Sequence, residues 1–305
     1  MQEKVKKQIS EAARVYIEEK QLSVNELARR AEINQSYVSQ MLGGKGENIA
    51  DKWYQRLAKT IGYAMERNYW DHVATPQYRA IIGYLEEARV TGRNRMIIAE
   101  SGAGKTYTIN RYVMNRPGGT YKVTVSGQHT LPQLVNDLCI MLALDNSGHY
   151  ALRIRAIANR LSLAQFEGTQ PLLIIDEAEN MDLRTFGALK LLYDSLEGTC
   201  PIVLIGTEQI DTKIAKMIRL NATGMPQFQR RFKAGRRVLP PIDKTFKLFL
   251  DEKVEDTRLK NLLRRLCLNY GELHDYLETA LKDADAMGQP LTYEIFCDIH
   301  CITNR

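Results

Sequence analysis

The chain has 305 residues, a hydrophobic fraction of 44%, a charged fraction of 26% and a formal net charge of +6. These values indicate a globular protein of about two domains that forms its core without metals or disulfides. No apolar run approaches the roughly 20 residues of a membrane helix, and the first ten residues have no apolar signal region. The five cysteines form no C-x-x-C pair, so we expect a cytoplasmic protein with reduced thiols, no zinc site and no membrane partner.

Residues 1–65 are predicted to form an all-α module. Apolar residues at helical spacing indicate a first helix, and local start and stop signals indicate three more. Either Ser23 or Asn25 caps the second helix, and Asn34 starts the third. The predicted helices cover about 5–20, 24–30, 35–42 and 51–61.

The second and third of these helices resemble a repressor-type helix-turn-helix domain. Ala28 occupies the crowded position between them, and Val38 and Met41 face the core, although Glu32 stands where the turn usually has glycine. The side chains left free to face a DNA groove or phosphates are Gln35, Ser36, Tyr37, Ser39 and Gln40. Lys45 and Lys52 add backbone contacts. The alternative is a small module that binds protein.

Residues 66–94 are predicted to be a linker and an entry helix. From Arg95 the pattern changes to short apolar strands that alternate with helices up to residue 239, which predicts a parallel sheet covered on both faces. The predicted strands begin near residues 95, 121, 171 and 201. After Pro240-Pro241 the remaining residues, 240–305, are predicted to form a small helical subdomain.

A phosphate-binding loop runs from Ala99 to Thr106, between the first strand and a helix. Gly102 and Gly104 allow the backbone amides to point at phosphates, and the helix start adds its positive dipole end. Lys105 reaches the β- and γ-phosphates, and the Thr106 hydroxyl binds Mg²⁺. The first position of this motif is usually glycine, and here it is alanine. The predicted nucleotide-binding residues of this segment are Ala99, Glu100, Ser101, Gly102, Ala103, Gly104, Lys105, Thr106 and Tyr107.

A second element supports this assignment, because the strand over residues 172–176 ends in two acids, Asp176 and Glu177. Ligands of open α/β sheets lie at this end of the strands. We expect Asp176 to hold Mg²⁺ through water, and Glu177 to orient and deprotonate the attacking water. The protein is therefore predicted to be a Mg²⁺-dependent ATPase.

Three further residues are candidates for catalysis. Thr207 follows the next strand and is predicted to touch the γ-phosphate or the water, unless it only caps a helix. Arg230 and Arg231 lie in a stretch, residues 219–237, with six basic residues and no acidic one. One of these arginines is expected to reach the γ-phosphate of a neighbouring subunit. Alternatively, they are surface or nucleic-acid-facing arginines.

This order of motifs resembles the AAA+ ATPases, and the segment EGTQPLLIIDEAE (167–179) resembles the family of the B transposition protein of phage Mu. The basic helix before this segment and the N-terminal module also match that family in order. The resemblance implies an α/β P-loop ATPase with an N-terminal helix-turn-helix domain and a C-terminal helical lid. It further implies an ATP-dependent filament on double-stranded DNA without strong sequence preference, capture of target DNA and activation of a partner transposase. The gene would then belong to a phage or mobile element of a bacterial host.

The lid of this family often carries arginine in a G-x-x-R pattern, whereas the matching stretch here is Gly271-Glu-Leu-His274. His274 is mostly neutral at pH 7. It is therefore either a residue that contacts nucleotide or a buried helix residue.

Arg153, Arg155 and Arg160 lie on the predicted helix before the acidic strand end. A filament that winds along DNA needs basic groups directed to phosphates, so these arginines are predicted DNA contacts. The alternative is a solvated basic face. The loop Ser126–Thr130 is a further candidate for approaching DNA.

Two other functions fit the same motifs. One is a helicase loader or replication-initiation ATPase, which would bind a replicative helicase in place of a transposase. The other is a nucleotide-gated transcription regulator, which would protect a single preferred operator.

Overall fold

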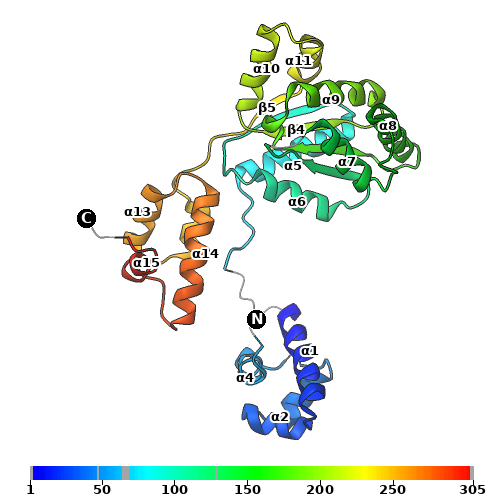
Figure 1. Cartoon of the computed structure of the whole chain (residues 1–305). Helices are drawn as coiled ribbons and strands as arrows, with labels where there is room; N and C mark the ends of the chain where they lie inside the picture. The colour runs from blue at the N-terminus through cyan, green and yellow to red at the C-terminus, as the bar shows by residue number, and fades with distance from the viewer. Residues whose placement is uncertain (1–2, 47, 64–68, 128–129, 303–305) are drawn as a thin grey trace. The chain divides into compact units, whose positions relative to one another are not determined.

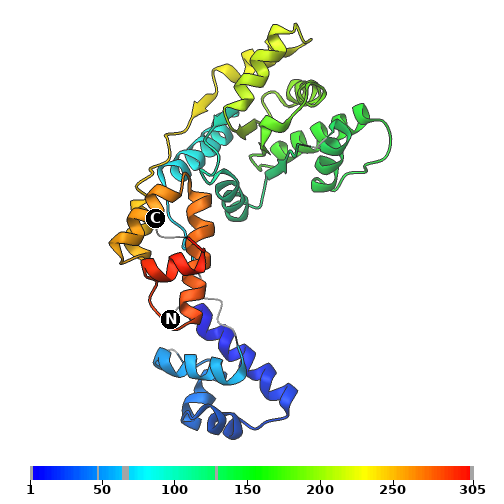
Figure 2. The ribbon, with the colours of Figure 1, turned by 60° about the vertical axis from the view of Figure 1, so that its left-hand side comes forward.

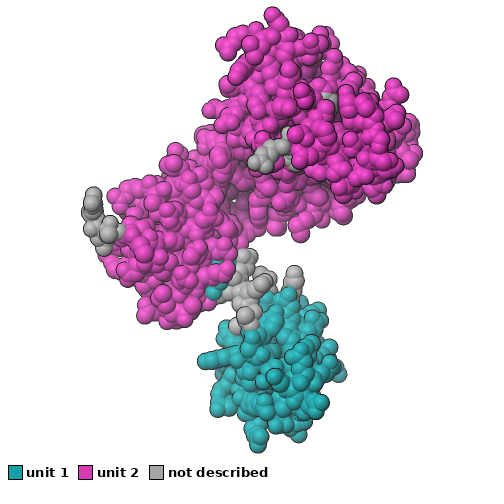
Figure 3. Space-filling view, in the orientation of Figure 1, with its two compact units in different colours: residues 1–69 teal, residues 70–305 magenta. Residues whose placement is uncertain are grey.

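In the computed structural model the chain divides into two compact units, residues 1–69 and 70–305 (Figure 3). The structure describes residues 3–46, 48–63, 69–127 and 130–302. Each unit has its own hydrophobic core. Within these ranges no helix is both long enough and apolar enough to cross a membrane.

The described part of the first unit is helical, and its helices follow the predicted order. They are α1 (Glu3–Lys20), α2 (Val24–Ala31), α3 (Gln35–Leu42) and α4 (Asp51–Ile61), drawn in blue in Figure 1. Ser23 is the residue that caps α2, because its hydroxyl accepts a hydrogen bond from the N–H of Glu26. Asn34 caps α3 as predicted.

The turn between α2 and α3 accommodates a glutamate in a conformation that favours glycine. Glu32 has φ 52° and ψ 42°, a left-handed geometry that costs a non-glycine residue roughly 1–2 kcal/mol. Its carboxylate forms an exposed ion pair with Arg56 of α4. Ala28, Val38 and Met41 are buried as predicted. The turn therefore brings α2 and α3 together although its glycine is missing.

The second unit contains a parallel sheet with the strand order β2-β3-β4-β1-β5. The strands are β1 (Arg95–Ile98), β2 (Thr120–Thr124), β3 (Leu172–Asp176), β4 (Ile202–Gly206) and β5 (Arg236–Val238) (Figure 1). Strands β1, β3 and β4 are buried at every position, as expected of central strands in a sheet covered on both faces. Because all strands run the same way, the loops that follow β1, β3 and β4 meet at one edge.

Alternate residues of each strand face opposite layers of helices. Ile98 and Leu173 belong to a core with α7 (Leu131–Met141), α8 (Tyr150–Phe166), α9 (Leu183–Leu196), α10 (Gln209–Arg219) and α11 (Met225–Lys233). Ile97 and Ile174 belong to a second core with α5 (Pro76–Thr91) and α6 (Lys105–Asn115). The predicted α/β fold with helices on both faces is thus confirmed.

The C-terminal helices form the predicted helical subdomain, which we call the lid. They are α12 (Lys247–Lys253), α13 (Thr257–Leu266), α14 (Tyr270–Ala286) and α15 (Tyr293–Ile299), and the turned view of Figure 2 shows them as one group in orange and red. Leu250, Leu263 and Leu277 share the core of α5 and α6. The break at Pro240-Pro241, predicted as a domain boundary, lies inside residues 70–305.

Helix α11 and strand β5 lie in the segment 219–237 and its flank, for which the sequence predicted only a basic stretch. Strand β5 is three residues long, two of them arginine, and its side chains are exposed or half-buried. It is an edge strand that pairs with β1. An edge strand this short has no apolar run to reveal it, so only its pairing with β1 defines it.

Candidate nucleotide-binding site

The predicted phosphate loop joins β1 to α6 at the carboxyl edge of the sheet. Gly102 has φ 70° and Gly104 has φ 78°, and both values favour glycine. Gly104 is the N-cap of α6, so the positive dipole end of this helix faces the loop. Ala99 is not among the described residues with positive φ, and its N–H donates to the Gly206 carbonyl at 2.9 Å. Alanine fits at the first position of the loop because this backbone is not left-handed.

Lys105 begins α6, and its side chain turns back over the loop. Its ammonium donates to the Glu100 carbonyl at 2.9 Å. Burial lowers the pKa of Lys105 below its ordinary value, and the carboxylates of Glu179, Asp176 and Glu177 partly offset this effect. The ammonium is therefore a partly desolvated cation beside three acids.

Asp176 and Thr106 come together across 70 positions of sequence. The Thr106 hydroxyl donates to Asp176 Oδ2 at 2.9 Å, and Asp176 is completely buried at the end of β3. Asp176 Oδ1 accepts the N–H of Glu177 at 3.0 Å. The predicted pair of metal-binding side chains therefore exists as a hydroxyl–carboxylate contact directly behind the phosphate loop.

These residues fit Mg²⁺ held jointly with a nucleotide. Mg²⁺ prefers oxygen ligands, and it is often bound by one or two side chains together with substrate phosphates. Thr106 and Asp176 supply such oxygens. No group of three or more His, Cys, Asp or Glu side chains that could hold a metal ion occurs in the described ranges, so the protein would need the phosphates to complete a Mg²⁺ shell.

Glu177 is held by a neighbour that the sequence reasoning did not assign. It has φ 54° and precedes the short helix η1 (Ala178–Asn180). The Asn180 amide donates to Glu177 Oε2 at 3.2 Å and to the Val125 carbonyl, just beyond β2, at 2.9 Å. Asn180 thus fixes the Glu177 carboxylate relative to the neighbouring strand.

Two side-chain oxygens in the cleft lack hydrogen-bond partners among the described residues. One is Thr207 Oγ1, at the end of β4, and the other is Glu179 Oε2. The Glu179 carboxylate lies over Gly206, where an added Cβ would be 2.0 Å from Oε2. Buried oxygens of this kind usually bind water or a ligand. Glu179 was not predicted, although it is the last acid of the DEAE segment.

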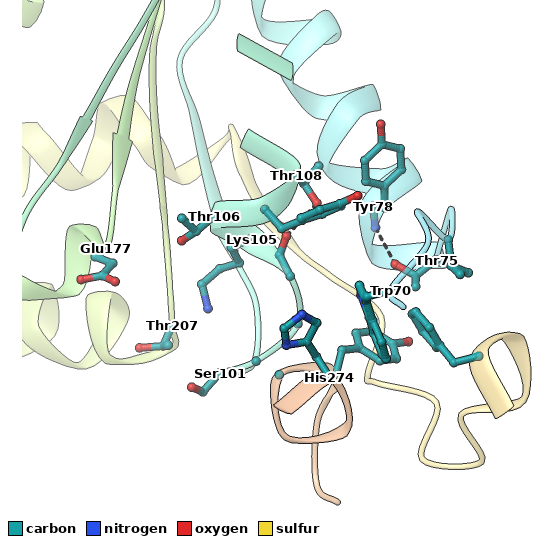
Figure 4. A pocket seen from close by; sticks show the side chains of 18 of the residues that line it. Trp70, Thr75, Tyr78, Ser101, Lys105, Thr106, Thr108, Glu177, Thr207 and His274 are labelled. Carbon is teal, nitrogen blue, oxygen red and sulfur yellow. Dashed lines mark hydrogen bonds between the residues drawn. The ribbon is translucent and has the colours of Figure 1, made fainter. Parts of the chain in front are cut away.

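The site opens into a cleft of about 500 Å³ between the sheet edge and the lid. Figure 4 shows the Lys105 ammonium with Thr207 and Glu177 on one side and with His274 and Trp70 on the other. Apart from Tyr107, the aromatic wall of this cleft was not predicted. Trp70 stacks on Phe249 at 4.8 Å between ring centroids, and the Tyr107 hydroxyl is 3.1 Å from His72 Nδ1. Trp70 and Phe249 come from distant segments, so no local motif could reveal them, whereas Tyr107 directly follows the phosphate loop and was predicted.

The lid contacts the phosphate loop directly at the start of α14. A Cβ added to Gly102 would lie 2.2 Å from Asn269 Oδ1. His274, one turn further on, lines the cleft with a side chain that is 38% exposed, and its ring meets that of Trp70 edge to face. The alternative that His274 is a buried helix residue is therefore wrong, because the first turn of α14 faces the open cleft.

Three of the six basic residues in the 219–237 stretch are paired with acids from other elements. Arg231 pairs with Asp194 of α9 and lies over the Tyr193 ring. The other two pairs join Arg236 to Asp211 and Arg237 to Glu87. The apparent excess of positive charge is thus reduced by folding. Neither Arg230 nor Arg231 lines the nucleotide cleft. Arg230 is exposed, and no described carboxylate forms an ion pair with it.

The predicted DNA-facing side chains of the first unit lie on its surface. Gln35, Ser36, Tyr37, Ser39, Gln40, Lys45 and Lys52 are all exposed. The Gln40 amide donates to the Ser36 hydroxyl at 3.2 Å, and the Lys52 ammonium lies 5.0 Å from the Trp53 ring centroid. The polar face of α3 is therefore accessible.

The three arginines of α8 do not form a single row. Arg153 and Arg160, seven residues apart, share one flank of the helix, and Arg155 lies on the other flank. Arg153 donates to the Asn146 carbonyl, and Arg160 is 3.5 Å from Glu167. Of the loop 126–130, residues 128 and 129 lie outside the described residues.

Comparisons with known proteins agree with this geometry. The family model of an AAA domain matches residues 89–214, which include the phosphate loop, β3 and β4. A curated relative is the Mu-like prophage FluMu DNA transposition protein B of Haemophilus influenzae. It is 25% identical over 208 residues, which cover 65% of this chain and 69% of the relative.

Solved structures with a similar fold include two proteins of Aeropyrum pernix. The ORC2 protein, solved in ADPNP–ADP complexes, has a TM-score of 0.54 at 14% identity. The match covers 77% of this chain and 69% of the ORC2 chain. The ORC1 protein in complex with DNA has a TM-score of 0.53 at 12% identity. The match covers 78% of this chain and 67% of the ORC1 chain. The chain thus matches an AAA domain over residues 89–214 and is similar, over 65% of its length, to a Mu-like transposition protein B.

Proposed function

We propose that the chain binds ATP with Mg²⁺ in this cleft and hydrolyses it, and that the bound nucleotide controls assembly of the protein on duplex DNA, where it activates a partner transposase. The observation that carries the proposal is the convergence of three loops at one sheet edge. They bring together Lys105 and Thr106 after β1, Asp176 and Glu177 after β3, and Thr207 after β4. This set supplies what phosphoryl transfer to water needs, namely positioning, charge neutralisation and a base.

The chemistry assigns a role to each group. The loop amides near Gly104 and the Lys105 ammonium hold the phosphates, and Lys105 leaves the Glu100 carbonyl to do so. Thr106 and Asp176 would hold Mg²⁺, which neutralises charge on the phosphate oxygens when bound. Glu177 accepts a proton from the attacking water, and the unpaired Thr207 hydroxyl orients that water or the γ-phosphate.

A neighbouring subunit completes the site in this proposal. An arginine that acts in trans must extend from the surface of its own subunit. Arg230 meets this condition, because it is exposed on α11, whereas Arg231 is held by Asp194 and Tyr193. We therefore assign the trans role to Arg230. Hydrolysis then depends on a homo-oligomer or filament, because an isolated subunit lacks this charge.

DNA enters the proposal through the relative and the first unit. The relative is named a DNA transposition protein, and α3 exposes a polar face beside Lys45 and Lys52. Lysines and polar side chains of this kind contact phosphates and groove edges. In this proposal the arginines of α8 add contacts to the DNA backbone.

Glu177→Gln tests the catalytic part. The substitution removes the base and keeps the shape, so ATP binding is retained and turnover falls by about 10²- to 10⁴-fold. Glu255→Gln is the matched control, because Glu255 is an exposed acid of the lid, and it leaves turnover unchanged. Unchanged turnover in Glu177→Gln would remove Glu177 from its role.

Co-sedimentation with duplex DNA tests the assembly part. The protein is expected to pellet with DNA in the presence of ATP and to stay in solution without nucleotide. Glu177→Gln is expected to stabilise the pelleted complex, because ATP persists in it. Equal binding with and without ATP, or no binding in either condition, would contradict nucleotide control.

A further inference from the structure

Asp176 has a cationic neighbour that none of the roles above uses. Lys122 lies on β2, where it is in register with Ile174 of β3. Its ammonium is 3.3 Å from Asp176 Oδ2 and donates to Asn110 Oδ1 of α6 at 2.7 Å. The Lys122 side chain is only 16% exposed, and that of Asp176 is 0% exposed. The pair is therefore largely shielded from solvent, and salt screens such a pair weakly.

The hydrogen bonds of Asp176 show what Lys122 contributes. Oδ2 accepts from the Thr106 hydroxyl, and Oδ1 accepts from the N–H of Glu177. Both donors are neutral. A buried carboxylate with only neutral donors is unfavourable, whereas one with a cation beside it is tolerated. Lys122 supplies such a cation from within the fold at 3.3 Å, whereas the Lys105 ammonium, a second positive charge near Asp176, donates to the Glu100 carbonyl.

We propose that Lys122 is the resident counter-ion of Asp176 and determines how strongly nucleotide binding depends on Mg²⁺. This inference rests on the proposed function, because it concerns the same site. A divalent cation held near Asp176 is repelled by the fixed charge of Lys122. Lys122 therefore weakens Mg²⁺ binding. Without the charge of Lys122, nucleotide binding would depend more strongly on Mg²⁺. Lys105 cannot replace Lys122, since its ammonium is required at the phosphates.

Binding of a fluorescent ATP analogue, measured in EDTA and over a series of free Mg²⁺ concentrations, tests the proposal. Lys122→Met removes the charge and keeps the chain length. We expect the ratio of the Kd in EDTA to the Kd in saturating Mg²⁺ to rise about tenfold in this variant. We expect the free Mg²⁺ for half-maximal binding to fall by a similar factor.

Three further variants serve as controls. Lys122→Arg keeps the charge and retains the wild-type Mg²⁺ dependence. Lys122→Gln keeps a hydrogen-bond donor without the charge and reproduces the change of Lys122→Met, even if the methionine variant folds poorly. Lys260→Met removes a lysine that lies 3.3 Å from Asp251 in the lid and leaves the Mg²⁺ dependence unchanged.

Thermal denaturation without nucleotide gives a readout that does not depend on activity. Lys122→Met is expected to have a lower Tm than the wild type, because the buried Asp176 carboxylate loses its counter-ion. Wild-type protein that binds no ATP analogue at any Mg²⁺ concentration would refute the proposed function and with it this inference. ATP binding with the same Mg²⁺ dependence in the wild type, Lys122→Met and Lys122→Gln would refute the role of Lys122 alone.

Discussion

The side chains around the phosphate loop owe their properties to burial and to a few neighbours. Lys105 is a partly desolvated ammonium near three carboxylates, and Glu177 is a carboxylate held by one amide. Neither property follows from the residue type. The first affects how ATP affinity depends on pH, and the second affects turnover.

The lowered pKa of Lys105 predicts that ATP affinity decreases in alkaline solution. The protonated form binds phosphate, and burial favours the neutral form, so the charge is lost as the pH rises through a pKa below that of a free lysine. Kd values for an ATP analogue between about pH 7 and about pH 10 measure this effect. Lys105→Arg stays charged throughout and should give a weaker but flat profile. A wild-type profile as flat as that of the arginine variant would contradict the prediction.

Asn180 is expected to act on turnover and not on binding. Asn180→Ala removes the donor to Glu177 Oε2, and the loss of one hydrogen bond that orients the base should lower kcat about tenfold. The Kd for ATP should not change, because Asn180 is not among the residues that line the cleft. Steady-state kinetics together with equilibrium binding separate these effects. Parallel losses in kcat and affinity would indicate a general structural defect.

At the scale of elements, one buried glutamine joins three parts of the second unit. Gln77, in the first turn of α5, is 1% exposed. Its amide donates to the carbonyls of Pro240 and Pro241 at 3.1 and 2.7 Å, and its Oε1 accepts from the Tyr270 hydroxyl at 3.1 Å. The entry helix, the proline break and the first residue of α14 are thus connected beside the cleft.

Gln77→Ala should destabilise residues 70–305 by about 2–4 kcal/mol, because it leaves buried carbonyls and a hydroxyl unpaired. Tyr270→Phe removes one hydrogen bond and should cost about 1 kcal/mol. In the double variant the cost of Tyr270→Phe should nearly disappear, since its partner is already gone. Urea unfolding, followed by the fluorescence of Trp70 in a Trp53→Phe background, measures these values. Additive costs in the double variant would show that the two side chains act independently.

At the scale of the whole molecule, the two units have separate cores. The core of residues 1–69 draws on the four N-terminal helices, and the nucleotide site is built from residues 70–305 alone. Nucleotide binding and any DNA contact through α3 therefore belong to different units.

A variant that comprises residues 70–305 is expected to fold and to bind ATP with the affinity of the full chain. Its binding to duplex DNA should be weaker and should depend less steeply on salt, because contacts from α3, Lys45 and Lys52 are lost. Circular dichroism, ATP titration and DNA binding at several salt concentrations check these points. DNA binding equal to that of the full chain would assign the first unit to a protein partner.

The features of this protein that could be predicted without the fold are encoded by contiguous residues. The phosphate loop depends on two glycines and the start of a helix. The acidic strand end depends on one run of buried apolar residues. Both could therefore be predicted, together with the roles proposed for them. The α/β class followed from strands that alternate with helices. Ala99 and Glu32 looked irregular in the sequence, and the structure accommodates both.

Tertiary structure alone decided which distant side chains share the site. Trp70 lines the cleft from the segment before α5. Lys122 of β2 contacts Asp176, and Asn180 of η1 contacts Glu177. The positions of all three depend on register and packing. The same holds for β5, whose pairing with β1 defines it, and for the basic stretch, whose charge is partly neutralised by acids far away in sequence. Local patterns specify short-range backbone geometry, whereas ion pairs and pockets arise only when the layers pack.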